Sequence, residues 1–142
     1  MVELDHSFST GKPAAYNLDA VLDLDRVIPC VEGGKVLERE SPDLAKAEIK
    51  VKMGAMSMTF KGTVEVAEKD EAARRAVLRV KSKDTGGSGY ANADVTFALD
   101  DGGGDIHTAA KITGKAASMG EGVVATVLDA LIKDFTTKLA TI

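Results

Sequence analysis

The sequence contains no tryptophan and a single cysteine, Cys30, and aromatic residues make up only 4% of its 142 positions. One cysteine excludes an internal disulfide bond and fits a reducing compartment, so we expect a cytoplasmic protein, with attachment to a membrane surface left open. No stretch approaches the roughly 18 consecutive apolar residues that a membrane span needs. Residues 1–10 alternate and carry acids, which is not the pattern of a signal peptide. The net charge of −4 argues against nucleic acid as a partner.

Groups for acid–base or nucleophilic catalysis are equally scarce, because the chain has only two histidines. We expect His107 on the wet face of a strand. His6 shares the apolar face of its strand, where it is either a satisfied core residue or a polar anchor for a ligand. Cys30 has no partner nearby in the sequence and is interpreted as a buried, inert thiol.

Metal and phosphate motifs are missing too. The acids Asp100, Asp101 and Asp105 surround glycines, but they lack the ligand order of a calcium loop and are interpreted as a hairpin turn. The glycine-rich run 86–89 is followed by neither Lys-Ser/Thr nor a helix, which excludes a phosphate-binding loop. We therefore expect no catalytic residue, no metal site and no covalently bound cofactor.

One long helical pattern is present, in residues 114–142. After Gly114, Gly120 and Gly122, apolar residues recur at helical spacing from Val123 to Leu139. A single amphipathic helix needs a partner for its apolar face, and the rest of the chain offers only a sheet.

The chain before this helix alternates with the period of two that indicates half-buried strands. The predicted strands cover 2–8, 35–40, 45–53, 58–66, 76–81, 91–99 and 106–112, with turns at 41–43, 54–56, 68–73, 85–89 and 100–105. Two short helical segments, 14–22 and 24–31, follow the first strand. This order predicts an α+β helix-grip fold in one domain, 1–142, in which a curved seven-stranded antiparallel sheet wraps round the C-terminal helix.

The inward positions of the predicted sheet include many small residues, which argues that one helix does not fill the space above it. The small inward residues are Ala45, Ala47, Gly62, Ala76, Ala91, Ala93 and Ala110. An apolar cavity is the favoured interpretation, and a filled core is the alternative. The predicted lining is Phe8, Met53, Met58, Phe60, Leu78, Val80, Phe97, Ile106, Ile112, Val124, Leu128, Leu131 and Phe135. The predicted polar anchors are His6, Tyr16 and Tyr90.

The turns of a meander fall alternately at its two ends, so three glycine- and methionine-rich turns share one end. These turns predict a gate built from Gly54, Met56, Gly87, Gly89, Met119 and Gly120, since glycine permits a tight or mobile backbone. The alternative is that they are ordinary short turns.

A set of short motifs resembles the CoxG family of carbon monoxide dehydrogenase subunits. The motifs are Val51-Lys52-Met53-Gly54, Phe60-Lys61-Gly62-Thr63, Ala73-Arg74-Arg75-Ala76-Val77-Leu78, Asp84-Thr85-Gly86-Gly87-Ser88-Gly89 and Ile112-Thr113-Gly114-Lys115, with Asp25-Arg26-Val27-Ile28-Pro29-Cys30 upstream. The chain departs from the family in two places. Pro29-Cys30-Val31 replaces the usual Pro-Gly-Cys, and Tyr16 or a neighbour stands where a tryptophan is common.

The resemblance implies the START/Bet v 1-like (SRPBCC) superfamily, whose helix-grip fold encloses a cavity for hydrophobic ligands. It also implies an accessory role beside a molybdenum-containing carbon monoxide dehydrogenase or related hydroxylase, in membrane recruitment or in handling its quinone acceptor.

Three functional hypotheses follow. The first is a non-enzymatic carrier of a quinone such as menaquinone, or of another isoprenoid or lipid, that contacts the inner membrane surface transiently. The second is a membrane-recruitment adaptor without a ligand. The third is a cyclase-like enzyme of the same superfamily.

Overall fold

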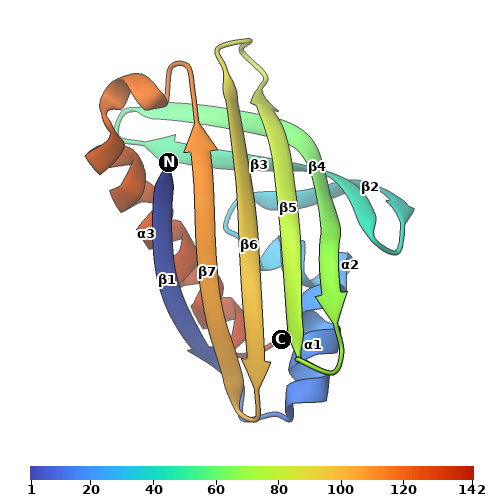
Figure 1. Ribbon diagram of the computed structural model, residues 1–142. Coiled ribbons are helices and arrows are strands. Elements are labelled where there is room, and N and C mark those ends of the chain that lie inside the picture. Colours follow the sequence, from blue (N-terminus) through green and yellow to red (C-terminus); the bar gives the residue numbers. More distant parts are fainter.

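The computed structural model describes residues 1–142 and forms one sheet, two short helices and one long helix (Figure 1). The strands are β1 (Val2–Ser9), β2 (Gly34–Ser41), β3 (Leu44–Met53), β4 (Met56–Asp70), β5 (Arg75–Asp84), β6 (Tyr90–Asp100) and β7 (Gly103–Ile112). The helices are α1 (Ala14–Leu22), α2 (Leu24–Val27) and α3 (Glu121–Leu139), with single 3-10 turns η1 (Ile28–Cys30) and η2 (Ala117–Met119).

The seven strands pair antiparallel in the order β1-β7-β6-β5-β4-β3-β2, so β1 and β2 are the edges. The sheet curves round α3, which lies along the inner side of β1 (Figure 1). The predicted helix-grip fold is therefore confirmed, including the two short helical segments after the first strand. Hydrophobic alternation sufficed here because each strand has one wet and one apolar face.

Two predicted turns are shorter in the structure than the sequence suggested. β4 continues to Asp70, with a register shift between Val66 and Glu68, and so includes charged residues that were expected in a turn. β7 begins at Gly103, and Asp105 pairs with Ser7 inside the sheet. Gly103 pairs with Ser9 of β1, and glycine is required there because a Cβ would overlap the carbonyl of Phe8.

The buried apolar side chains divide into two clusters at opposite ends of the sheet. The larger cluster packs α1 and α2 against the sheet around Phe97 and also includes Phe135 and Leu139 of α3. The smaller cluster gathers Met53, Phe60 and Val124 at the end where α3 begins. The interior between the two ends is where the candidate site lies.

Asn17 of α1 fastens the larger cluster to the β6–β7 hairpin. Its side chain is 1% exposed, and its amide donates to the carbonyls of Lys12 and Asp100 at 2.9 and 3.0 Å. Its Oδ1 accepts a 2.7 Å hydrogen bond from Thr10. A buried amide must be satisfied in this way, so Asn17 fixes where α1 closes the sheet.

Candidate functional site: an apolar cavity between the sheet and α3

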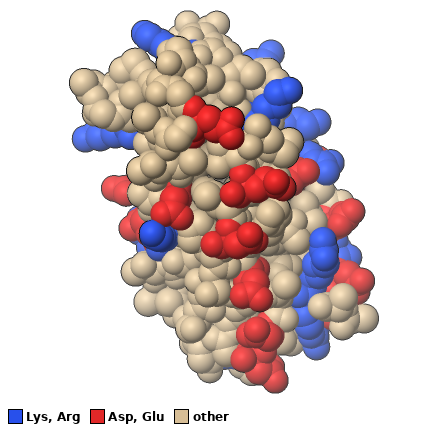
Figure 2. All heavy atoms as spheres, turned by 60° about the vertical axis from the view of Figure 1, so that its left-hand side comes forward, with Lys and Arg blue, Asp and Glu red and all other residues tan.

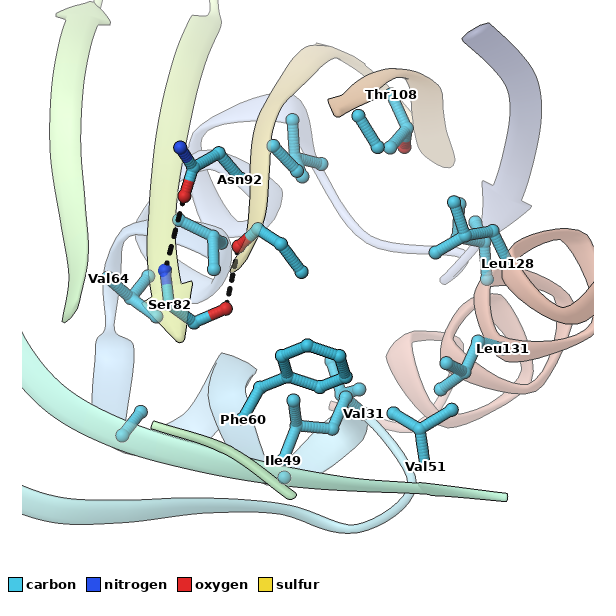
Figure 3. A pocket seen from close by; sticks show the side chains of 18 of the residues that line it. Val31, Ile49, Val51, Phe60, Val64, Ser82, Asn92, Thr108, Leu128 and Leu131 are labelled. Atoms are coloured by element: carbon cyan, nitrogen blue, oxygen red, sulfur yellow. Dashed lines mark hydrogen bonds between the residues drawn. The ribbon is translucent and has the colours of Figure 1, made fainter. Parts of the chain in front are cut away.

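A cavity of about 250 Å³ lies between the inner face of the sheet and α3. It is lined by 32 residues, of which 25 are hydrophobic, so its wall offers ligands mainly apolar contact. The lining comes from β2 to β7, from α3, and from α2 and η1, and Figure 3 shows part of it at close range.

Small side chains on the floor of the cavity account for the space. Ala47, Gly62, Ala91, Ala93 and Ala110 all line it. By contrast, Ala45 and Ala76 are 0% exposed and belong to the larger core cluster. The space therefore lies over the middle of the sheet, where α3 makes few contacts with the strands, and not above Ala45 and Ala76.

Most of the side chains predicted to line a cavity do so in the structure. They are Met53, Phe60, Leu78, Val80, Phe97, Ile106, Ile112, Val124, Leu128, Leu131 and Phe135. The exceptions are Phe8 and Met58, which are 7% and 6% exposed and packed into the two core clusters. Both lie near the ends of their strands, where alternation places them inward correctly but says nothing of position along the cavity.

Several residues that line the cavity were not predicted from the sequence. Val27, Ile28 and Val31 come from α2, η1 and the residues after them. Ile49 and Val51 of β3 fall on the apolar face of a predicted strand but were not expected in the cavity. The signal was present in the sequence, because Ile49 and Val51 alternate with Lys50 and Lys52. Both lysines are exposed in the structure.

The end of the cavity beneath the predicted gate is covered by buried residues. Met53, Ala116 and Val124 are 3%, 1% and 4% exposed, and none of the predicted gate residues Gly54, Met56, Gly87, Gly89, Met119 and Gly120 lines the cavity. Half-buried lining residues occur on several elements, among them Val51 of β3 and Leu131 of α3 (Figure 3). The burial of the lining therefore does not single out an entrance, and the gate stays a prediction.

Two of the glycines at that end serve close packing. A Cβ on Gly114 would overlap the carbonyl oxygen of Ser88, and a Cβ on Gly89 would lie 2.5 Å from the oxygen of Thr113. The two loops are also joined by a 3.0 Å hydrogen bond from the Lys115 amide to the Ser88 carbonyl. Gly87 and Gly120 also have positive φ, but the position that a Cβ would take at either residue is open.

The polar side chains in the cavity wall are few. The Ser82 hydroxyl donates a 2.6 Å hydrogen bond to the carbonyl of Ala91, and the Asn92 side-chain oxygen accepts from the Ser82 amide at 3.3 Å (Figure 3). Thr108 of β7, labelled in the same figure, is 4% exposed and its hydroxyl has no hydrogen-bond partner. These polar positions were not among the predicted anchors.

His6, a predicted anchor, joins β1 to α3. Its Nε2 lies 2.7 Å from Oδ1 of Asp129, whose other oxygen is 2.9 Å from the Lys133 ammonium. Lys133, and then His6, hold the pKa of Asp129 below its ordinary value. The His6 side chain is 9% exposed and does not itself line the cavity.

Tyr16 and Tyr90, the other predicted anchors, lie outside the cavity lining. The Tyr16 hydroxyl accepts hydrogen bonds from Arg26 and Lys12 and donates to the carbonyl of Ile142. The Arg26 bond is the main cause that lowers the pKa of Tyr16. Tyr90 begins β6 and pairs with Thr113 through its backbone. Tyr16 therefore tethers the chain end at the opposite end of the fold.

The outer face beside β1 carries a band of acidic side chains (Figure 2). His107 of β7 lies on this face, as predicted, and its side chain is 43% exposed. Its Nδ1 is 2.7 Å from Asp5 and its Nε2 is 3.5 Å from Glu3, and the Asp5 hydrogen bond is the main cause that raises the pKa of His107.

Substitution of Asp5 by asparagine should lower the pKa of His107, and Glu3→Gln should lower it less, because the Asp5 contact dominates. A raised pKa means that this pair stabilises the fold below the ordinary histidine pKa of 6.5 and that the contribution fades as pH rises through the raised value. NMR titration of the imidazole in the two variants measures this, and equal shifts in both would contradict it.

The remaining candidates for chemistry give no site. Cys30 is half-buried, not buried as expected, and desolvation raises the pKa of its thiol, which keeps it a poor nucleophile. No group of three or more histidine, cysteine or carboxylate side chains is placed to hold a metal ion. None of the helices combines the length and apolar character that crossing a membrane requires.

Comparison with protein families supplies one match, which covers nearly the whole chain. The family model of CoxG, a carbon monoxide dehydrogenase subunit, matches residues 7–142. No match was found among curated proteins.

The solved structures that share this fold include a conserved protein, an aromatase/cyclase and Ara h 8.0201. A conserved protein from Geobacillus kaustophilus is 22% identical, with a TM-score of 0.74 over 97% of this chain and 90% of that one. The ZhuI aromatase/cyclase from Streptomyces sp. R1128 is 13% identical, with a TM-score of 0.60 over 97% and 90%. Ara h 8.0201 is 12% identical, with a TM-score of 0.55 over 97% and 94%. At these identities the similarity establishes a Bet v 1-like fold alone.

Proposed function

The chain belongs to the CoxG family of carbon monoxide dehydrogenase subunits, and we propose that it binds an apolar small molecule as a non-enzymatic accessory protein. The family name points to a carbon monoxide dehydrogenase as the enzyme it serves, and a related molybdenum hydroxylase is the alternative. The ligand proposed is a quinone such as menaquinone, or another isoprenoid or lipid. Acting as a cytoplasmic carrier, the protein would meet the inner membrane surface transiently.

The observation that carries this proposal is the cavity itself. Its wall is apolar over most of its extent, and its few polar groups lie mainly on β5 to β7. Ligand pockets have this character, in which burial provides affinity and a few polar groups provide orientation. Burial of apolar ligand surface contributes roughly 25 cal/mol per Å², so a wall of this kind favours a ring or hydrocarbon chain over a polar metabolite.

The size of the cavity limits what it encloses. Its volume of about 250 Å³ is slightly below the roughly 300–1,000 Å³ of typical small-molecule sites. A ring system with a short substituent fits such a volume, whereas a long isoprenoid tail does not. A longer tail would have to extend out of the cavity, for example between α3 and β3, where the apolar side chains of Val51 and Leu131 are half-buried.

A cyclase-like activity is the second candidate, favoured by the similarity to an aromatase/cyclase. Catalysis of that kind requires titratable groups that converge on the substrate. The polar residues of the lining are Glu48, Thr63, Ser82, Asn92 and Thr108. Glu48, the titratable member, belongs to the outward-facing set of β3 between Ala47 and Ile49. The cavity therefore supports binding better than it supports catalysis.

Native mass spectrometry of the protein purified from its own host tests the proposal. We expect a retained apolar molecule, and we expect added menaquinone to bind when that molecule is stripped away. If no apolar molecule is ever retained and menaquinone does not bind, the carrier function is wrong. The ligand-free adaptor would then be favoured, because it needs only an outer surface.

A further inference from the structure

The outward-facing side chains of the sheet separate by charge along the strands. In the half next to the start of α3 the charged ones are mainly lysines, and in the other half they are mainly acids. Figure 2 shows basic side chains around the upper end of the molecule and the acidic band below them. The exposed lysines of the first half form what we call the lysine surface: Lys50, Lys52, Lys61, Lys81, Lys83 and Lys111.

The strand register brings these lysines together across neighbouring strands. Lys61 of β4 lies directly opposite Lys83 of β5, and Lys81 lies in the next row. Asn92 of β6 continues that row, because it pairs with both Lys81 and Lys111. Like charges placed directly opposite each other in a sheet are destabilising. The fold therefore concentrates positive charge here at a cost in stability that an anionic partner would offset.

The lysine surface is not neutralised by carboxylates of the fold. None of its lysines forms an ion pair, although Glu48 lies opposite Lys61 across β3 and β4. The adjacent row in the acidic half differs, since Arg79 lies 4.0 Å from Glu65 and 2.9 Å from Asp94. The charge of the lysine surface is thus available to a partner outside the molecule.

Apolar side chains are exposed at the same end of the fold. Val123, in the first turn of α3, is 43% exposed, and Met56 and Met119 are half-buried. Lys115, in the loop after β7, adds an exposed positive charge, and Glu121 is an exposed acid where α3 begins. Lysine side chains beside apolar ones suit the boundary between lipid headgroups and acyl chains, because the long stem lies along apolar surface while the ammonium stays in water.

The residue types at this end favour a membrane over a protein or a nucleic acid. Protein interfaces are enriched in arginine and depleted of lysine, and base readout in nucleic acids relies most often on arginine. Anionic headgroups instead attract lysine as a point charge, without a fixed geometry. Tyr90, which pairs with Lys83 and is half-buried, belongs to a residue type that is enriched at membrane–water interfaces.

We propose that the lysine surface is the side on which the protein docks to a membrane of anionic phospholipids. The headgroup phosphates lie against the lysine ammonium groups, next to the apolar side chains at the start of α3. This inference rests on the proposed function, in which a carrier meets the membrane, and adds which side of the molecule makes that contact. The acidic band beside β1 is repelled by the same headgroups and lies away from them.

Binding of the purified protein to lipid vesicles tests this orientation. The net charge of −4 by itself opposes binding to anionic lipid, so a preference for such lipid reports the local lysine surface. We expect equimolar phosphatidylglycerol–phosphatidylcholine vesicles to bind the protein about a hundredfold more tightly than phosphatidylcholine vesicles, and added salt to weaken this preference. The triple variant K61Q/K81Q/K83Q should lose most of the preference, because each lysine near an anionic surface contributes roughly fivefold.

The triple variant K69Q/K133Q/K138Q is the matched control, because it removes the same charge from the far part of β4 and from the later half of α3. It should keep the preference for anionic vesicles. An equal loss in the two variants overturns the docking surface, and so does equal binding of the unaltered protein to both kinds of vesicle, a result that needs no variant to fold. Menaquinone binding in native mass spectrometry separates this failure from that of the proposed function. A protein that binds menaquinone without preferring anionic vesicles is still a carrier, whereas one that never binds an apolar molecule is not.

Discussion

Replacing Ala93 by phenylalanine should reduce the affinity for an apolar ligand about a hundredfold and leave the stability of the fold unchanged or slightly increased. Ala93 lies on β6 in the floor of the cavity, opposite Val80 of β5 and Ala110 of β7. A phenyl group there occupies the space that the ligand needs. An aromatic ring buries roughly 150–250 Å², which at about 25 cal/mol per Å² corresponds to about 4–6 kcal/mol. Losing half of this burial lowers affinity by about two orders of magnitude.

Ala76→Phe is the matched control for this substitution. Ala76 lies on β5 opposite Phe97, is 0% exposed, and does not line the cavity. The added ring therefore overpacks the larger core cluster, and we expect a loss of about 1–3 kcal/mol. Ligand titration and urea unfolding of both variants measure the contrast. Equal destabilisation of the two would show that the space above Ala93 does not exist in solution.

Gly114→Ala should destabilise the fold by about 3 kcal/mol, because two separate penalties fall on one residue. Gly114 has φ of +81°, a left-handed conformation that costs other residues roughly 1–2 kcal/mol. The new Cβ also overlaps the Ser88 carbonyl, so the two loops must separate and the 3.0 Å hydrogen bond from Lys115 to Ser88 is lost. A hydrogen bond of this kind contributes about 1 kcal/mol.

Gly87→Ala isolates the conformational part of that effect. Gly87 has φ of +79°, and the position that a Cβ would take there is open, with no heavy atom beyond its chain neighbours within 4 Å. We expect a loss of about 1 kcal/mol, and thermal unfolding should show a decrease in melting temperature roughly one third of that for Gly114→Ala. If both variants lose the same stability, the close approach of Gly114 to Ser88 contributes nothing.

The cavity could be predicted to a large extent from local pattern. Alternation identified Phe60, Leu78 and Phe97 as inward, and the small residues Ala93 and Ala110 indicated unfilled space, which the structure confirms. Alternation could not exclude Phe8 or Met58, because facing inward is a property of one strand. Whether an inward side chain meets a cavity or a neighbour depends on what packs above it.

The predicted anchor His6 illustrates the same limit. His6 was identified because it interrupts an apolar face, but Asp129, its partner, is 123 positions away in the sequence. Thr108 fits the inward set of its strand and gave no separate signal. Its buried hydroxyl lacks a partner because the strand register places Leu4 and Val95 opposite it.

The sequence by itself determined the element order and the antiparallel helix-grip fold. It also determined that the interior is apolar and contains few titratable side chains. These depend on local periodicity and composition, which neighbouring residues along the chain express directly. Only the tertiary structure decided that α3 rests against β1 and stands off the middle strands, where the cavity lies, and that the Gly114 loop is fastened to the loop at Ser88. Those features depend on strand register and on close contact between distant segments, which no short window of sequence contains.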